Sequence, residues 1–522
     1  MDRDPATLPQ VLQGAAARHG ARVALRMRGR EVRYAELWGG ALAMAGGLRA
    51  AGVMPGDRVV LMLPNSPEFV LAYFAIQAAG AIVVPAYPLL KPDELAYLLG
   101  DAEPRAVLSV SLCSASIREA RARAGAAIPA YMADPEGGAL AEGDRGWRDL
   151  MAGGPASAPP PPEDPEAVAA CLYTSGTTGR PKGAMLTHRN LVSNVVSFRA
   201  VCPVTEQDVF LTVLPLFHAF GATVMMLYPL SAGATVVLEP RFVPDAILKV
   251  MAEARVTHFS GVPAMYAVWA DTPAPPLDLS AWRVAISGAA ALPPSVTERF
   301  EVRYPVKIFE GYGPTECAPV LTVNPPGGRR KVGTVGPSLP GVRLRIVDQD
   351  GAELPPGSVG EVAASGPNVM RGYWRRPEET RAVLRDGWYH TGDLGSLDED
   401  GYLTIVDRKK DLVIVGGLNV YPSEVEMVIG SHPAVADVAV LGLPDAARGE
   451  VPHALVVLRQ GASAAPRDLL HYCRERLAKY KVPRGLDIVP ALPKTATGKV
   501  AKGNVRQELL ARLQGPDSQA AQ

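Results

Sequence analysis

The sequence has no excess of charge of either sign, and this absence removes one large class of partners. Lysine and arginine together number 53 in 522 residues, and aspartate and glutamate also number 53. A protein whose main partner is a nucleic acid or an anionic membrane carries a positive surplus that attracts phosphate groups. We therefore expect no nucleic-acid partner, although local basic sites stay open.

Cysteine is also scarce, with five residues in the chain. None of them forms a CxxC pair or lies beside histidines at metal-ligand spacing. We expect no disulfide framework in a chain this long, and therefore a reducing, cytoplasmic location. Cys317 is the one cysteine beside a suspected site, and we interpret it as a packing residue rather than a nucleophile.

Long uninterrupted apolar segments are missing as well. The first residues, MDRDPATLPQ, are acidic, so we expect no signal peptide. Two uncharged stretches, 69–87 and 211–230, have enough residues to be considered as membrane spans, but glycine and proline interrupt both. We therefore predict shorter helices and strands in their place and no transmembrane segment.

What the sequence does contain is an alternation of β-branched strands with helical patterns. Hydrophobic residues make up 48% of the chain, enough for a large core. Helices are expected at 67–79 and 92–99, between buried strands. This alternation predicts an α/β fold of parallel sheets covered by helices. The expected strands are 58–63, 81–87, 106–111, 234–239, 256–261 and 282–288.

The character of the chain changes twice towards its end. Short strands and Asp-Gly turns over about 331–406 predict a small β-rich subdomain. A charged cluster, DRKKD, then precedes a unit of mixed helices and strands. We predict a large N-terminal domain at 1–409, which includes the β-rich subdomain, and a small α+β domain at 410–522. A proline-rich linker at 151–167 lies within the first.

The most informative segment follows that linker: YTSGTTGRPKG, residues 173–183. Glycines let successive backbone N–H groups converge on an anion, and hydroxyls and Lys182 add donors and positive charge. The segment is not a Walker A loop, which requires GxxxxGK followed by Ser or Thr. A Ser/Thr/Gly loop could equally be a solvent-exposed turn, so the segment alone leaves phosphate binding open.

Five further motifs follow it in a fixed order. Together the six motifs resemble the adenylate-forming superfamily of acyl-CoA synthetases, peptide-synthetase adenylation domains and firefly luciferase, over nearly the whole chain. The resemblance implies activation of a carboxylic acid by ATP to an acyl adenylate, followed by transfer of the acyl group to a thiol such as that of CoA. The five motifs are LPLFHAFG (214–221), EGYGPTE (310–316), YHTGD (389–393), DRKKDLVIVGGLNVYPSEVE (407–426) and PKTATGK (493–499).

The resemblance assigns roles to residues at the phosphates of ATP. Glu316 corresponds to the carboxylate that binds Mg²⁺, with Thr174 as a second ligand, and a hard cation suits both oxygens. The residues of the glycine-rich segment, Thr174 included, would hold the β- and γ-phosphates; they are Thr174, Ser175, Gly176, Thr177, Thr178, Gly179 and Lys182.

The nucleoside of ATP is assigned to three further motifs. Tyr312 resembles the aromatic residue that stacks on adenine, although a tyrosine between glycines can also be a turn residue. Asp393 matches the aspartate that binds the ribose hydroxyls, with Arg408 as its basic partner. The other expected nucleotide-binding residues are Gly288, Ala289, Ala290, Gly311, Gly313 and Thr315.

The last domain is implied to carry the catalytic lysine and to move. Lys499 matches the lysine that reaches the α-phosphate and the substrate carboxylate in the first half-reaction. Lys410 matches the hinge about which this domain rotates between the two half-reactions. Gly416 and Gly417 match the wall of the tunnel through which the pantetheine of CoA reaches the acyl group.

His218 bears on the acid. Relatives that activate amino acids carry an aspartate at this position, which pairs with the substrate ammonium; without it the buried cation would be unpaired. The apolar segment 219–230, with its methionines, suits an alkyl channel, but it also suits a core. We therefore predict a medium- to long-chain fatty-acid–CoA ligase, with His218 at the active site.

Several alternatives stay open on the sequence. The enzyme could load a carrier protein instead of CoA, or activate an aryl or other carboxylic acid. A nucleotide-binding module without catalysis is disfavoured by the presence of Lys499, Glu316 and Asp393. Pro314 departs from the apolar residue that relatives usually carry before the Thr-Glu pair, so pocket shape and chain length are undetermined. Peripheral membrane contact and a homodimer are also left open.

Overall fold

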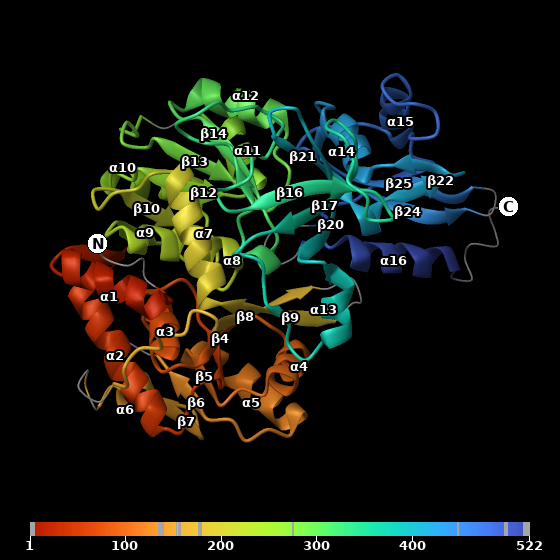
Figure 1. Cartoon of the computed structure of the whole chain (residues 1–522). Helices are drawn as coiled ribbons and strands as arrows, with labels where there is room; N and C mark the ends of the chain where they lie inside the picture. The colour runs from red at the N-terminus through yellow and green to blue at the C-terminus, as the bar shows by residue number, and fades with distance from the viewer. Residues whose placement is uncertain are drawn as a thin grey trace. The chain divides into compact units, whose positions relative to one another are not determined.

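The structure is a computed structural model that describes residues 6–133, 140–152, 154, 158–175, 180–273, 276–445, 448–494 and 500–514. The chain forms two compact units, whose elements are labelled in Figure 1. The first comprises Met1–Leu292, Val296–Leu344 and Ala364–Tyr389, and the second comprises Pro293–Ser295, Arg345–Ala363 and His390–Gln522.

One eight-stranded sheet of the first unit runs in the order β15-β14-β13-β12-β10-β11-β1-β2. Its strands from β14 to β1 are parallel, and β2 and β15 are antiparallel edges. The short β-branched runs place buried strands where the sequence predicts them. The strands are β1 Val23–Met27, β2 Arg30–Arg33, β10 Val209–Thr212, β11 Thr235–Leu238, β12 His258–Gly261, β13 Val284–Ser287, β14 Ile308–Tyr312 and β15 Thr322–Val323.

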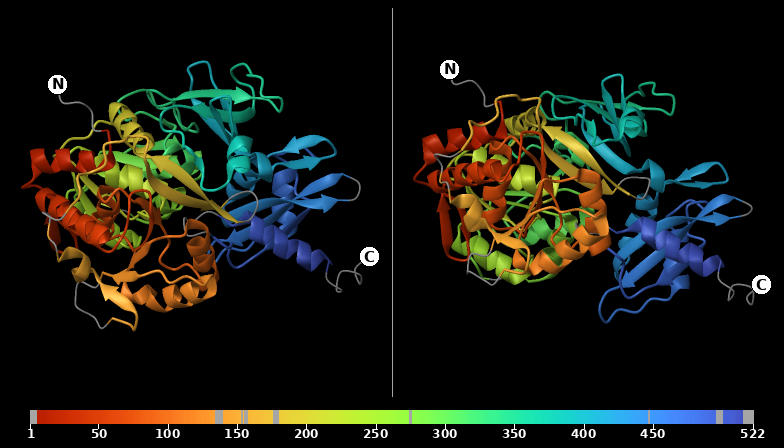
Figure 2. Two further views of the ribbon diagram at one scale, coloured as in Figure 1. Left: turned by 60° about the horizontal axis from the view of Figure 1, so that its bottom comes forward. Right: turned by 90° about the horizontal axis from the view of Figure 1, so that it is seen from below.

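A second eight-stranded sheet has the order β18-β9-β8-β4-β3-β5-β6-β7. It is parallel from β8 to β7, and β9 and β18 are added antiparallel. The β8–β9 ribbon, which leads into and out of the glycine-rich segment, is amber in both views of Figure 2. The strands are β3 Arg58–Met62, β4 Ile82–Pro85, β5 Ala106–Ser109, β6 Ala130–Met132, β7 Asp144–Gly146, β8 Val168–Ser175, β9 Pro181–Thr187 and β18 Gly372–Tyr373.

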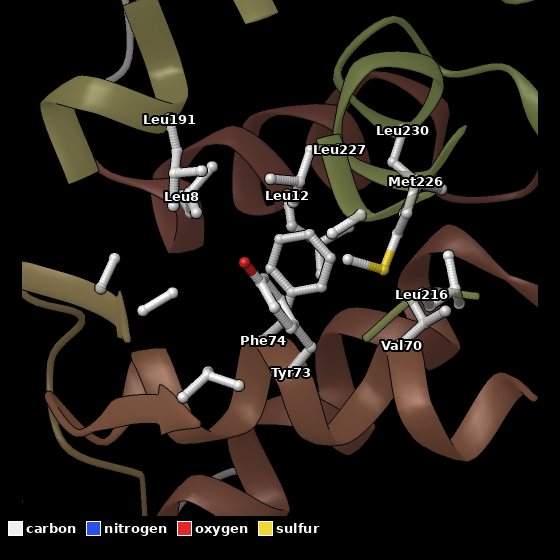
Figure 3. Packing of buried hydrophobic residues seen from close by; sticks show 14 of the residues in the cluster. Leu8, Leu12, Val70, Tyr73, Phe74, Leu191, Leu216, Met226, Leu227 and Leu230 are labelled. Carbon is white, nitrogen blue, oxygen red and sulfur yellow. The ribbon is translucent and has the colours of Figure 1, made fainter. Parts of the chain in front are cut away.

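Helices bury their apolar faces between these sheets. Figure 3 shows Tyr73 and Phe74 pointing towards Leu12 and Leu227 in the largest core. These aromatic side chains are at most 1% exposed, and burial of each contributes roughly 1.5–3 kcal/mol. The helices of the unit are α1 Leu8–His19, α2 Tyr34–Ala50, α3 Pro67–Ala78, α4 Pro92–Ala102, α5 Ser114–Ala124, α6 Trp147–Met151, α7 His188–Val201, α10 Pro244–Glu253, α11 Pro263–Asp271, α12 Pro294–Arg303 and α13 Pro377–Val383.

The stretch 211–230 breaks at Pro215, as predicted, but its second half is one helical run. It consists of α8 Ala219–Ala222, a π-helical turn at Thr223–Leu227 and α9 Tyr228–Ser231. Pro229 has no N–H to donate to the carbonyl of Met225, four residues earlier, and that carbonyl accepts instead from the Thr212 hydroxyl at 3.1 Å. Among the described residues, no helix is both long enough and apolar enough to cross a membrane.

Two smaller sheets follow in the chain. The first has the order β16-β17-β20-β19, with β21 paired to β20, and the Asp400-Gly401 turn joins β20 to β21 as an antiparallel pair. The second has the order β23-β22-β25-β24, with β26 paired to β25. The strands are β16 Arg343–Val347, β17 Gly360–Ser365, β19 Leu384–Arg385, β20 Trp388–Leu397, β21 Leu403–Arg408, β22 Val413–Val415, β23 Leu418–Val420, β24 Val435–Asp445, β25 Gly449–Leu458 and β26 Gly485–Ile488; the helices are α14 Pro422–Gly430, α15 Pro466–Arg474 and α16 Lys502–Gln514.

The predicted fold class is therefore confirmed: parallel-rich sheets with helices form the large part of the chain, and a small mixed unit ends it. The compact second unit also takes in 345–363 and 390–409. The functional boundary between 409 and 410 concerns where one part moves against the other, and it stays a prediction.

Candidate active site

Several predicted site residues meet at the carboxyl edge of the first sheet. Gly288 directly follows β13, Gly311 and Tyr312 end the adjacent strand β14, and the loop bearing His218 follows β10. The carboxyl ends of parallel strands are where α/β sheets bind ligands, because loops and backbone groups converge there. The topology thus brings three motifs to one edge.

Backbone geometry in this region requires small residues. A methyl group on Gly313 would overlap the carbonyl oxygen of Pro319, so the chain cannot carry a larger residue there without rearranging. Ala289 has a φ of 71°, in the left-handed region that costs a non-glycine residue roughly 1 kcal/mol or more. Strain of this kind is common where a backbone is held for a ligand.

Thr174 and Glu316 come together from the two sheets. The Thr174 hydroxyl, at the end of β8, lies 3.4 Å from Glu316 Oε1. Glu316 lies in the short 3-10 turn η4, Thr315–Cys317, and its side chain is buried. The Tyr373 hydroxyl donates to the same oxygen at 2.9 Å. The two predicted metal ligands are therefore neighbours. The sequence did not predict Tyr373 as a site residue, because a single tyrosine in RGYW carries no recognisable pattern.

Lys182 lies on β9, and its ammonium is paired with the Glu379 carboxylate. It also lies 5.2 Å from the centre of the Tyr373 ring, within the range of a cation–π contact. Ser175 ends β8, but its side chain and residues 176–179 lie outside the described residues. The predicted roles of Ser175, Gly176, Thr177, Thr178 and Gly179 therefore stay predictions.

His218 is half-buried at the start of α8, where its Nδ1 accepts a hydrogen bond from the backbone N–H of Phe220 at 3.3 Å. The loop before it is held by the buried Asn65, whose amide donates to the carbonyl of Leu214 at 3.0 Å and accepts from the N–H of Leu216 at 2.9 Å. Sequence reasoning missed Asn65, which lies far away in the chain.

Half-buried apolar side chains border this edge. A Cβ added to Gly288 would lie 3.1 Å from the Phe220 ring, so a glycine at this position leaves room for the ring. The methionines at 225 and 226, in contrast, are fully buried in the core. Their burial therefore does not support the predicted alkyl channel. These two methionines are core residues. The partly buried apolar residues are Phe217, Phe220, Val262, Met265 and Tyr312.

In the second unit, Asp393 and Arg408 are directly opposite each other on β20 and β21. The Arg408 Nε lies 3.2 Å from the buried Asp393 carboxylate. Lys410 is exposed in the 3-10 turn Lys409–Asp411. Gly416 and Gly417 form the turn between β22 and β23 with φ of 57° and 86°, so the hairpin itself requires glycine there. Lys499 lies outside the described residues.

Two further buried side chains of the first unit are those of Glu310 and Cys317. Burial raises the pKa of the Glu310 carboxyl, next to Gly311, to about 7. Cys317 is fully buried, in keeping with its interpretation as a packing residue. Among the described residues, no three histidine, cysteine, aspartate or glutamate side chains are grouped to hold a metal ion.

Comparison with known proteins connects these residues to a family. The AMP-binding enzyme family matches residues 12–374, and the AMP-binding enzyme C-terminal domain matches residues 424–499. A long-chain-fatty-acid–CoA ligase of Bacillus subtilis (strain 168) is 36% identical, over 96% of this chain and 94% of that protein. A feruloyl-CoA synthase of an Amycolatopsis species is 40% identical, over 93% of this chain and 95% of that protein.

A solved structure agrees with these sequence matches. The crystal structure of ATP-bound MatB from Rhodopseudomonas palustris superposes with a TM-score of 0.89 at 37% identity, covering 97% of this chain and 99% of that one. The family models and relatives cover most of the chain. The chain therefore belongs to the AMP-binding enzymes of the adenylate-forming superfamily, and it is an acid–thiol ligase.

Proposed function

We propose that this enzyme joins a medium- to long-chain fatty acid to CoA at the expense of ATP. The observation that carries the choice of acid is the apolar edge formed by half-buried Phe217, Phe220, Val262 and Met265 beside the loop of His218. An aspartate that could pair with a substrate ammonium is absent from that loop, LPLFHAFG. The fatty-acid–CoA ligase relative spans nearly the whole chain, which supports the same choice.

In the proposed first half-reaction, a carboxylate oxygen of the acid attacks the α-phosphorus of ATP, and pyrophosphate leaves. Tyr312 and the small residues at Gly288 hold the base, and Asp393 binds the ribose with Arg408 beside it. Lys499 neutralises charge that develops on the α-phosphate and the carboxylate. The glycine-rich segment with Lys182 orients the departing pyrophosphate.

The residues at Glu316 fit a magnesium ion. Mg²⁺ prefers oxygen ligands and is commonly bound by one or two carboxylates together with substrate phosphates. Glu316 and Thr174 offer a carboxylate and a hydroxyl 3.4 Å apart. The ion, when bound, would neutralise part of the triphosphate charge.

In the proposed second half-reaction, the CoA sulfur attacks the acyl carbonyl, and AMP leaves. Rotation about Lys410 removes Lys499 from the site and admits pantetheine past the Gly416-Gly417 turn. The two exposed glycines at that turn have no side chain to obstruct a neighbouring chain. One active site would thus serve both half-reactions in sequence.

A second candidate is an aryl acid in place of the fatty acid. The feruloyl-CoA synthase relative favours it, as does the Phe220 ring lying against Gly288. A flat acid could stack on such a ring.

The deciding experiment measures pyrophosphate release with ATP, Mg²⁺ and a panel of acids. We expect the highest kcat/KM for a fatty acid between C8 and C18, and little release with amino acids. Highest kcat/KM for ferulate would establish the second candidate, whereas highest kcat/KM for an amino acid would refute both. Adding CoA or a carrier protein then identifies the acceptor through thioester formation.

A further inference from the structure

Tyr373 contacts two residues of the predicted phosphate site. Its hydroxyl donates to Glu316 Oε1 at 2.9 Å, and the same oxygen is 3.4 Å from the Thr174 hydroxyl. The face of its ring lies 5.2 Å from the ammonium of Lys182. Tyr373 therefore contacts two residues assigned to the triphosphate, Glu316 and Lys182, and shares its acceptor oxygen with the third, Thr174.

The backbone around Tyr373 fixes it firmly. Tyr373 pairs with Ala184 on β9, and the N–H of Trp374 donates to the carbonyl of Gly183 at 2.7 Å. On the other side, the N–H of Met370 donates to the carbonyl of Glu316 at 2.7 Å. The segment 368–374 thus ties the turn that bears Glu316 to the strand that leaves the glycine-rich loop.

Tyr373 is itself held by a second buried tyrosine. Tyr389 forms a side-chain hydrogen bond with Tyr373, and Tyr389 is the donor because Tyr373 gives its single hydroxyl proton to Glu316. The result is a directed chain from Tyr389 through Tyr373 to Glu316.

These hydrogen bonds affect the orientation of the Glu316 carboxylate. The hydrogen bonds from Tyr373 and Thr174 both go to Oε1 and use neither lone pair of Oε2. A carboxylate fixed at one oxygen cannot rotate freely, so its other oxygen keeps a constant direction. Groups that hold a ligand in this way commonly matter for metal affinity or activity by about 10- to 100-fold.

We infer that Tyr373 is a positioning residue for the magnesium carboxylate, and that Tyr389 supports it. Tyr373 orients Glu316 so that Oε2 faces the cation that accompanies the triphosphate. This inference rests on the proposed role of Glu316 as the magnesium ligand. It also makes RGYW (371–374), which the sequence left unassigned, part of the catalytic apparatus.

The test is Tyr373→Phe, which keeps the ring, its packing and its contact with Lys182 but removes the hydroxyl. Pyrophosphate release is measured against Mg²⁺ concentration at saturating ATP and acid, and binding of Mn²⁺ in the presence of ATP without acid is measured by electron paramagnetic resonance. We expect the Mg²⁺ concentration for half-maximal rate to rise about 10-fold, and excess Mg²⁺ to restore most of the rate. Tyr389→Phe should shift it in the same direction by a smaller factor.

Tyr34→Phe is the matched control. The Tyr34 hydroxyl is also fully buried and donates to the carbonyl of Ala234 at 2.6 Å, in a part of the unit where no site residue lies. It should lower the melting temperature without changing the Mg²⁺ dependence. An unchanged Mg²⁺ dependence in Tyr373→Phe would refute the inference, and so would a rate loss that excess Mg²⁺ does not reverse.

Glu316→Gln separates this inference from the proposed function. If Glu316 binds the metal, this variant should lose adenylation by at least about 100-fold at every Mg²⁺ concentration. Wild-type activity in Glu316→Gln would refute the metal role itself. Loss in Glu316→Gln with a normal Mg²⁺ profile in Tyr373→Phe would refute only the positioning role. If Tyr373→Phe fails to fold, Tyr389→Phe decides between the same outcomes.

Discussion

At the scale of single residues, the buried Glu310 makes the stability of the first unit depend on pH. Burial raises the pKa of its carboxyl from 4.5 to about 7, and hydrogen bonds from the backbone of Leu292 and Gly333 only partly offset this. Between about pH 4.5 and 7 the folded state therefore binds more protons than the unfolded state. The contribution is favourable below this window and is lost as the pH rises through it, by at most about 3 kcal/mol.

Glu310→Gln should remove this dependence, because the amide oxygen can still accept the hydrogen bond from Leu292 but never ionises. At pH 8 we expect the variant to be more stable than the wild type by about 1–3 kcal/mol, with the difference vanishing near pH 4.5. Urea unfolding at several pH values measures it, with the exposed Glu353→Gln as control for the loss of one charge. A variant less stable than the wild type at pH 8 would contradict the assignment.

At the scale of elements, the loop that carries His218 is held in place by one side chain. Asn65 precedes α3. Its side-chain amide donates hydrogen bonds to the carbonyls of Leu214 and Glu239 and accepts one from the N–H of Leu216. Asn65→Ala leaves these buried backbone groups without partners, which costs about 1–3 kcal/mol for each group. We expect a lower melting temperature and a KM for the acid at least threefold higher, with the KM for ATP changed less.

Asn324→Ala is the control for that experiment. Asn324 is equally buried and bridges another loop of the same unit, with bonds to the carbonyl of Thr334 and the N–H of Lys331. It should destabilise the fold to a similar degree and leave the KM for the acid unchanged. Equal changes in that KM in both variants would show that Asn65 acts through general stability alone.

The elements themselves could largely be predicted, whereas the contacts between them could not. Runs such as Arg58–Met62 and Val284–Ser287 form strands because β-branched side chains favour a pleated, buried backbone. The helical run through Pro229 was not predicted, since tertiary packing of Met225 and Leu227 outweighs the local break signals. The same packing shows why a methionine-rich stretch indicates a core as readily as a substrate channel.

At the scale of the whole molecule, the site depends on contacts between residues that are distant in the chain. Asn65 and Leu216 are 151 positions apart, and Glu316 and Tyr373 are 57 apart. No local pattern records such a pair, because periodicity reports only which face of an element is buried. The motif order could identify the family, but the tyrosines behind Glu316 needed the structure.

The predicted C-terminal domain, 410–522, leads to a prediction for the complete reaction. If Lys499 serves only the first half-reaction, Lys499→Ala should lower adenylation by at least about 100-fold, whereas supplied acyl adenylate should still give thioester with CoA. Lys494→Ala is the matched control: Lys494 is five positions earlier and pairs with Asp437 at 2.8 Å within the second unit. Pyrophosphate release and thioester formation are measured separately for each variant. Equal loss of both half-reactions in Lys499→Ala would contradict rotation of the predicted C-terminal domain, 410–522, about Lys410, because a residue withdrawn from the site cannot impair the step that follows its withdrawal.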